Sequence, residues 1–352
     1  MPADSRQPRW RLPAEWEPHR ATWIAWPHYE PDWPGKLAPI PWVYGEIARR
    51  LAEGELVHTL VQSKTHEEGA RRLLTRVGAD LSKIRFHRVP TDRGWTRDSG
   101  PAFVVRDDPA PRVAVAHFGF NGWAKYPDFR KDARVAAWAA AKLKLSLFPS
   151  GVVLEGGAID VNGRGTLVTT EECLLDPCVQ VRNPGLDRAG YERTFGEFLG
   201  VTNVLWLGRG IAGDDTHGHV DDLCRFVSPT TAVLCHEEDP KDENFTALEE
   251  NRERLEGARL EDGGRLEVVK LPMPAPLSLD GRRLPASYAN FAIGNAAVLV
   301  PTFNDPKDRL ALGILAELFG DRPVVGIHAV DLVWGLGTLH CLTRQQPTDP
   351  GA

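Results

Sequence analysis

The sequence lacks features that define several large classes of protein. No apolar run approaches the roughly 20 residues that a membrane-spanning helix needs, and residues 1–11 have no apolar core of the kind found in secretion signals. Positive charge is not in excess, because 42 Lys and Arg stand against 48 Asp and Glu, a formal net charge of -6. We therefore expect a soluble, cytoplasmic protein that binds neither nucleic acid nor a membrane surface.

Cysteine is also scarce. The chain has five cysteines, which are Cys173, Cys178, Cys224, Cys235 and Cys341. Their odd number and the lack of a Cys-x-x-Cys spacing argue against a disulfide framework or a zinc knuckle and favour a reducing compartment. The first four lie in or beside apolar runs, which predicts core positions. Cys341 differs, because a histidine precedes it and Gly335 and Gly337 allow close backbone approach.

The chain does contain a repeated unit, a strand hairpin followed by a helix and a further strand. The unit is clear four times, and the first strands of its hairpins are predicted at 95–105, 152–161, 217–227 and 288–293. Helices follow at 132–144, 191–199, 242–255 and 308–319. A fifth unit is split between the ends of the chain, with its N-terminal strands and helices at 21–27, 43–53, 56–61, 65–77 and 84–89. Such a repeat outranks local patterns in deciding the fold.

These repeats predict an α/β fold built from five ββαβ modules arranged in a pseudo-symmetric ring. The ring closes where a C-terminal hairpin containing residues 335–343 pairs with the strand at 21–26. Since no linker interrupts the modules, residues 1–352 form a single domain, with a short disordered tail from about residue 346.

Each module carries polar residues inside the apolar first strand of its hairpin. These residues are Asp98, Glu155, His217, His219, Asp221 and Asn290. Equivalent positions in a ring converge on its axis. A charge on an apolar strand is costly unless it is paired, so four modules with polar groups at one position indicate a functional site near Cys341.

The sequence around His219 admits two interpretations. His217, His219 and Asp221 alternate, so in a strand all three face one side. They could bind a metal, or His219 could serve in a metal-free acid/base pair. No other histidine has ligand-like spacing, and three ligands from one strand need a distant fourth. We therefore favour the interpretation without a metal.

Cys341, His219 and the carboxylates of Asp98, Glu155 and Asp221 suit the chemistry of a planar cation. Carboxylates bind guanidinium groups through paired hydrogen bonds. A thiolate could attack the central carbon, while the histidine would protonate the departing ammonia and then activate water to hydrolyse the thiouronium. The acidic surroundings disfavour a thiolate until the cation binds. This chemistry needs no cofactor.

The chain resembles the agmatine deiminase and bacterial peptidylarginine deiminase family, within the guanidine-modifying (pentein) superfamily of five-bladed α/β-propellers. The motifs that carry this resemblance are Pro13–His19, Trp95–Pro101, Leu154–Gly157, Thr169–Leu175, Gly218–Asp221, Ala286–Phe291 and His340–Cys341. The resemblance implies that Cys341 is the nucleophile and that His219, with Glu155 as its partner, is the acid/base. It also implies that Asp98 and Asp221 bind the guanidinium. The further substrate contacts that we expect are Trp95, Asn290, Gly337 and Thr338.

By this resemblance the activity is hydrolysis of agmatine to N-carbamoylputrescine and ammonia, a step of putrescine biosynthesis. The run Gly335–Cys341 and Arg344 depart from the family's pattern beside the nucleophile, so free arginine and peptidyl arginine stay open as substrates. An arginine at position 344 favours a carboxylate if it lies near the pocket, and otherwise lies on the surface. Two other classes stay open, a metal-dependent amidohydrolase and a catalytically silent guanidinium-binding module, as does a homo-oligomeric state.

Overall fold

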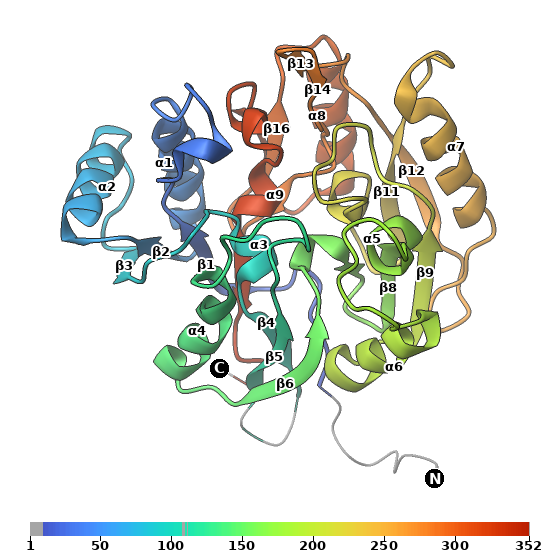
Figure 1. The fold of residues 1–352 in the computed structure, drawn as a ribbon, viewed down its shortest axis with the longest axis horizontal. Helices are drawn as coiled ribbons and strands as arrows, with labels where there is room; N and C mark the ends of the chain where they lie inside the picture. Colours follow the sequence, from blue (N-terminus) through green and yellow to red (C-terminus); the bar gives the residue numbers. More distant parts are fainter. Residues whose placement is uncertain (1–9, 108–109, 111, 352) are drawn as a thin grey trace.

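Residues 10–107, 110 and 112–351 are described by a computed structural model, in which most of the sheet strands belong to five small mixed sheets (Figure 1). Four of these sheets have three strands, in the orders β4-β5-β6, β7-β8-β9, β10-β11-β12 and β15-β16-β17. In each of them the first strand is antiparallel to the second, and the second is parallel to the third. The repeated module predicted from the sequence is therefore present in these four sheets.

The four modules follow one another along the chain. The first contains β4 Ala102–Val105, β5 Val113–Gly119, α4 Val135–Leu143 and β6 Leu147–Val153. The second contains β7 Asp160–Val161, β8 Thr166–Thr170, α5 Glu171–Leu175, α6 Arg188–Leu199 and β9 Asn203–Leu207. The third contains β10 Cys224–Phe226, β11 Thr231–His236, α7 Glu243–Leu255 and β12 Glu267–Pro272. The fourth contains β15 Ala292–Ile293, β16 Val298–Thr302, α8 Lys307–Leu318 and β17 Val324–His328.

The fifth sheet joins the two ends of the chain. Its N-terminal part consists of β1 His19–Ala25, α1 Ile40–Ala52, β2 Leu56–Val61, α2 Lys64–Arg76 and β3 Ile84–Arg88. Strand β18, Arg344–Pro347, lies antiparallel to β1, with Trp23 opposite Arg344. A C-terminal segment does pair with the N-terminal strand, but the segment that pairs is 344–347 rather than the predicted 335–343. Residues 335–343 contain the end of a 3-10 helix and the short helix α9, Leu339–Leu342, and Gln346 and Pro347 are in β18 rather than in a disordered tail.

Local sequence explains the helices and the central strands. Ser63, Asp187 and Asp242 each accept a hydrogen bond from a backbone N–H of the first turn of α2, α6 and α7, which satisfies a donor that the helix itself cannot. Gly200 ends α6 with a φ of 70°, a conformation that glycine adopts without strain. Strand β8 is buried along its whole length, as are residues 298–301 of β16. Helices α2, α4, α6 and α7 lie at the periphery, whereas α9 and α3, Thr96–Ser99, lie near the centre (Figure 1).

The predicted first strands of the hairpins are too long, and the difference matters for the site. Strands β4, β7, β10 and β15 are only two to four residues long. In three modules a helical turn precedes the strand, and these turns are α3, η3 Gly156–Ala158 and η4 Val220–Asp222. The polar residues lie in or beside these turns, so the side-chain alternation of a strand does not apply to them.

Shorter elements complete the described residues. They are η1 Glu30–Asp32, η2 Asp132–Arg134, η5 Leu332–Gly335 and the hairpin of β13 Ser278–Leu279 with β14 Arg282–Arg283. Among the helices described, we find none that is both long and apolar enough to cross a membrane. One cysteine prediction is wrong, since Cys178 is exposed, whereas the other four cysteines are buried.

Candidate active site

Cys341 lies in α9 at a cavity of about 230 Å³. The cavity is also lined by Trp95, Asp98 and Gly337, three of the residues that the sequence predicted for the site. Gly337 is required there because a Cβ at this position would lie 2.9 Å from the Trp95 ring and 3.2 Å from the Cys341 sulfur. The conformation of residues 335–341 therefore brings the cavity wall directly against the thiol.

Asn290 forms hydrogen bonds that position Cys341 and the segment before it. Its Nδ2 donates hydrogen bonds to the Cys341 Sγ at 3.1 Å and to the Asp222 Oδ1 at 2.9 Å. Its Oδ1 accepts from the Thr338 hydroxyl at 2.8 Å and from the His340 backbone N–H at 3.0 Å. Asn290 and Thr338 are 1% exposed and are absent from the cavity lining, so the structure gives both of them a supporting position rather than a place in the cavity wall.

The carboxylates of Asp98 and Asp221 lie on α3 and η4, close to the thiol. Asp98 accepts hydrogen bonds from the Gly157 backbone N–H and the Trp123 Nε1, both at 2.9 Å. Asp221 lies one layer deeper, with its Oδ2 3.8 Å from the Cys341 Sγ and its Oδ1 buried without a hydrogen-bond partner among the described residues. Buried polar oxygens nearly always have partners, so this oxygen is available to a donor that enters the site.

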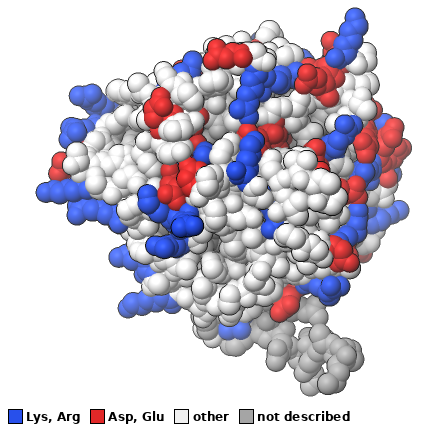
Figure 2. All heavy atoms as spheres, viewed as in Figure 1, with Lys and Arg blue, Asp and Glu red and all other residues white. Residues whose placement is uncertain are grey.

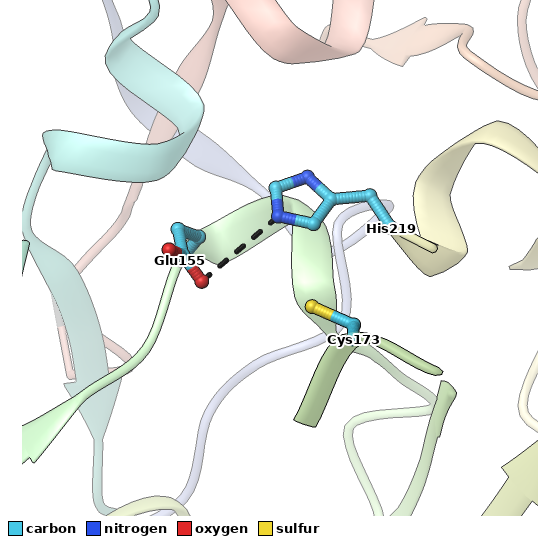
Figure 3. Close-up of side chains that lie close together, drawn as sticks. All are labelled: Glu155, Cys173 and His219. Atoms are coloured by element: carbon cyan, nitrogen blue, oxygen red, sulfur yellow. Dashed lines mark ion pairs between the residues drawn. The ribbon is translucent and has the colours of Figure 1, made fainter. Parts of the chain in front are cut away.

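His219 lies among the carboxylates. Its Nδ1 is 3.9 Å from the Asp98 Oδ1 and 4.0 Å from the Asp221 Oδ1, and its Nε2 is 4.0 Å from the Glu155 Oε2 (Figure 3). These separations are those of ion pairs rather than of hydrogen bonds. Burial by itself favours the neutral ring, but the surrounding negative charge, led by Asp98, prevails and raises the pKa of His219 well above its ordinary value. The carboxylates around His219 therefore favour its protonated form.

Glu155 remains ionised despite complete burial. The desolvation of its carboxyl favours protonation, but Arg182 and His219 outweigh this effect and lower the pKa of Glu155 to about 2. Arg182 donates from its Nε to the Glu155 Oε1 at 3.1 Å, and both side chains are wholly buried. Because Arg182 occupies one carboxylate oxygen, the other is left facing His219 (Figure 3).

The thiol of Cys341 has the opposite environment. Burial is the largest cause that raises its pKa, followed by the negative charges of Asp221, Asp222 and Asp98, and together they place the pKa of Cys341 well above its ordinary range. These surroundings favour a neutral Cys341 thiol. A cation bound between the carboxylates would offset their effect and favour the thiolate.

The sequence did not predict the second layer of the site. His340 bridges two carboxylates, with its Nδ1 2.6 Å from the Asp221 Oδ2 and its Nε2 2.8 Å from the Glu15 Oε2. Glu15 also accepts from the Arg225 Nη2 at 2.8 Å, and Arg97 lies 3.5 Å from the same oxygen. Glu15 lies within a motif that the sequence offered, but its partners are 82 to 325 positions away, and no local pattern reveals them.

Two residues lie away from the positions that the sequence predicted. His217 has a positive φ of 62°, and its Nε2 pairs with Asp176 at 2.9 Å, so it does not share a strand face with His219 and Asp221. Arg344 is neither at the surface nor in the cavity lining. It is 4% exposed, and its Nε donates to the Pro101 carbonyl at 2.7 Å.

The mouth of the cavity carries charges of both signs. Asp215 pairs with Lys125 at 2.8 Å and with Arg282 at 2.6 Å. Asp32, which also lines the cavity, pairs with Arg93 at 2.5 Å, and burial still raises the pKa of Asp32 to about 7. Figure 2 shows basic and acidic side chains next to one another near the middle of this face. The mouth therefore has groups for a substrate's ammonium and groups for a carboxylate.

Comparison with known proteins agrees with this architecture. The family model for Porphyromonas-type peptidyl-arginine deiminases matches residues 11–347, and the chain belongs to this family of guanidine-modifying enzymes. Within it, the chain is similar to agmatine deiminases. The enzyme of that name from Pseudomonas aeruginosa (strain LESB58) is 35% identical over 96% of this chain and 95% of its own.

Solved structures give the same result. The agmatine deiminase of Enterococcus faecalis superposes with a TM-score of 0.89 at 30% identity, covering 96% of each chain. A substrate-bound agmatine deiminase of C. jejuni superposes with a TM-score of 0.87 at 28% identity, covering 99% of each chain. The sequence-based assignment to this family is confirmed.

Proposed function

We propose that this protein is an agmatine deiminase that hydrolyses agmatine to N-carbamoylputrescine and ammonia. The observation that carries the proposal is the placement of Cys341 at the cavity with the carboxylate of Asp221 3.8 Å from its sulfur and that of Asp98 in the same lining. A thiol so close to carboxylates suits a cationic electrophile, and the similarity to agmatine deiminases over almost the whole chain supports agmatine as that cation.

The reaction begins with binding of the guanidinium between Asp98 and Asp221. Its positive charge favours loss of the Cys341 thiol proton to solvent, and the thiolate attacks the central carbon and forms a C–S bond. The His219 imidazolium gives a proton to one amino group, which leaves as ammonia. Water then adds to the thiouronium carbon while His219 takes one of its protons. The C–S bond breaks as the remaining hydroxyl proton passes to the departing Cys341 sulfur, which leaves the ureido product and the free thiol. These steps use side chains and solvent alone, so the reaction needs no cofactor.

Glu155 has a supporting role in this sequence. Its carboxylate, which Arg182 keeps ionised, stabilises the protonated form of His219 until His219 transfers its proton to the leaving amino group. Trp95 closes the cavity wall beside Gly337, where its ring can cover the alkyl chain of agmatine. Asn290 and Thr338 keep the thiol in position.

We also propose that the five sheets are the blades of one closed pentein propeller and that residues 1–352 form a single catalytic domain. The pairing of β1 with β18 supports closure, because it joins the two ends of the chain in one sheet. The repeated strand order in the other four sheets supports the pseudo-symmetry. We place the enzyme in the cytoplasm.

Free arginine is a second candidate substrate, for a specific reason. Arg282 lines the mouth of the cavity, where it could pair with the carboxylate that arginine has and agmatine lacks. Its guanidinium is already engaged with Asp215 at 2.6 Å, which favours agmatine as the better substrate. The metal-dependent alternative is weaker because His217 is paired with Asp176, away from His219.

The test is formation of ureido product from agmatine, arginine and an arginyl peptide at equal concentrations. We expect agmatine to give the highest kcat/KM. Cys341→Ser should abolish turnover and keep agmatine binding measurable by calorimetry. Turnover by Cys341→Ser near the wild-type rate, or activity that chelators remove and zinc restores, would show that the thiol mechanism is wrong.

A further inference from the structure

A second thiol lies behind the histidine of the active site. Cys173, in α5, is 3% exposed and has no place in the reaction described above. Its Sγ, a carboxylate oxygen of Glu155 and a ring nitrogen of His219 all lie within 4.8 Å of one another (Figure 3). The three residues come from three separate segments, so their convergence is a feature of the fold rather than of one short motif.

Two atoms in this cluster are buried without hydrogen-bond partners among the described residues. They are the Nε2 of His219 and the Oε2 of Glu155, which face each other across 4.0 Å. Arg182 binds the other oxygen of Glu155 and so leaves Oε2 uncommitted. Unsatisfied buried polar atoms are rare in proteins. A pair of them beside a thiol indicates a common ligand for all three side chains.

We propose that Glu155, Cys173 and His219 form a binding site for a thiophilic divalent cation such as Zn²⁺, and that occupancy of this site inhibits the enzyme. Sulfur, imidazole nitrogen and carboxylate oxygen are the three ligand types that zinc takes in proteins. Tetrahedral bonds of about 2.0–2.3 Å place ligand atoms roughly 3.3–3.7 Å apart, so the side chains must close by at most about 1.5 Å. The inhibition, though not the binding, rests on the proposed deiminase function.

Binding has a defined proton balance. The cation takes the lone pair of the His219 Nε2 and the thiolate of Cys173, so one proton leaves the imidazolium and one leaves the thiol. The His219 ring is then neutral and keeps only its Nδ1 proton, so it is a much weaker acid for the departing ammonia. Binding should weaken as pH falls, because protons compete for both ligands. Since all three side chains are almost wholly buried, onset of inhibition should be slow.

A rival cluster must be separated in the test. Asp221, Asp222 and Cys341 also bring three ligand atoms within 4.8 Å of one another, beside the cavity. We therefore make the direct measurement in the Cys341→Ser background, which removes the rival thiol. Co²⁺ reports cysteine ligation through its sulfur-to-metal charge-transfer absorption. Cys178→Ser, which changes an exposed thiol five positions from Cys173, is the matched control.

We expect the Cys341→Ser protein and its Cys178→Ser derivative to bind one Co²⁺ with the charge-transfer band, and the Cys173→Ser derivative to lack the band. In the active enzyme, Zn²⁺ should inhibit slowly and a chelator should reverse the inhibition. Cys173→Ser should keep the activity measured without zinc. Its half-inhibition should need at least roughly tenfold more Zn²⁺ than that of the wild-type enzyme. Cys173→Ala, checked for folding by circular dichroism, should behave likewise.

Two results would overturn the proposal. One is a Cys341→Ser protein that binds no Co²⁺ with the thiolate band. The other is equal zinc sensitivity of the wild-type enzyme and Cys173→Ser, which would place any inhibitory ion at Cys341. If no deiminase activity is found at all, the cobalt measurement still decides whether the site binds a cation, so failure of the proposed function is distinguishable from failure of this one.

Discussion

Substitution of Glu15 by glutamine tests whether the buried second layer controls the chemistry. Glu15 is 5% exposed, and its Oε2 accepts hydrogen bonds from His340 and Arg225, each at 2.8 Å. Its Oε1 accepts from the Ile293 backbone N–H at 2.9 Å. Glutamine keeps the volume but has one acceptor oxygen and a donating amide. Whichever way the amide turns, at least one buried donor faces another donor.

The structure sets the size of the effect on stability. Leaving a buried donor without an acceptor costs about 1–3 kcal/mol, and removing one member of a buried ion network costs about 3–5 kcal/mol. We expect the free energy of unfolding of Glu15→Gln, measured by urea denaturation at neutral pH, to fall by about 3–5 kcal/mol. Cations in the network lower the pKa of Glu15 well below its ordinary value against the effect of burial. The stabilisation by Glu15 is thus lost as pH falls, and the two proteins should converge in acid.

The effect on activity passes through His340. The His340 ring lies between the carboxylates of Glu15 and Asp221. Burial raises the pKa of Asp221, but its hydrogen bond to His340 and the His340 charge outweigh this effect and lower that pKa. Without the Glu15 carboxylate, the contact that holds the His340 ring against Asp221 is lost, so the pKa of Asp221 rises. We expect kcat/KM for agmatine to fall about 10- to 100-fold, since one charge-assisted hydrogen bond is worth about 1.5–3 kcal/mol. The acid limb of the kcat/KM profile should move to higher pH.

The control is Glu17→Gln, two residues along the same segment. Glu17 pairs with Arg11 at 2.6 Å, its side chain is 30% exposed, and among the described residues its hydrogen bonds go to Arg11 and Ala14 rather than to the site. This variant should keep the wild-type profile and most of the stability. If Glu15→Gln loses stability but keeps the wild-type acid limb, Glu15 has only a structural role and the reasoning about Asp221 is wrong.

Two further predictions concern the cavity mouth and an outlying histidine pair. Arg282→Gln should raise the kcat/KM ratio of agmatine to arginine several-fold, because it removes a cation that could pair with the carboxylate of arginine and one of the two cations paired with Asp215. Arg283→Gln, which loses a pair with Asp242 outside the cavity, should leave the ratio unchanged. His87 lies 2.7 Å from His58, and burial is the main cause that lowers the pKa of each to about 4. At these two histidines the folded protein therefore binds fewer protons than the unfolded chain, so the free energy of unfolding measured in urea should fall as the pH drops from about 6.5 to 4. The fall should be less steep in His87→Gln. An unchanged slope would contradict this reasoning.

The sequence was sufficient for elements whose pattern is local. The strand predicted at 56–61 matches β2, because it is an apolar run bounded by turn residues. The first strands of the hairpins failed for a physical reason. Their apolar composition resembles a strand, but the backbone at 96–99, 156–158 and 220–222 turns into helical geometry.

The repeat predicted convergence even where the local structure was wrong. Asp98, Glu155 and His219 meet because they occupy equivalent places in successive modules, whatever their backbone conformation. Glu15 and Arg182 have no such repeat. Their partners are chosen by tertiary packing, and a single sequence has no signal for a pair such as Glu15 and His340. The sequence thus revealed the groups that we propose to react better than the buried residues that determine their pKa values.

In the mechanism that we propose, the arrangement of charge keeps the Cys341 thiol neutral until a cation binds. At 3.8 Å and an effective dielectric near 20, one carboxylate disfavours a negative charge on the Cys341 sulfur by about 4 kcal/mol. A guanidinium at a similar distance contributes the same magnitude with the opposite sign. Arg182 keeps Glu155 ionised, and His340 and Arg225 lower the pKa of Asp221 against the effect of burial, although none of the three lines the cavity. In the mechanism that we propose, the cation bound beside these carboxylates also favours ionisation of the Cys341 thiol.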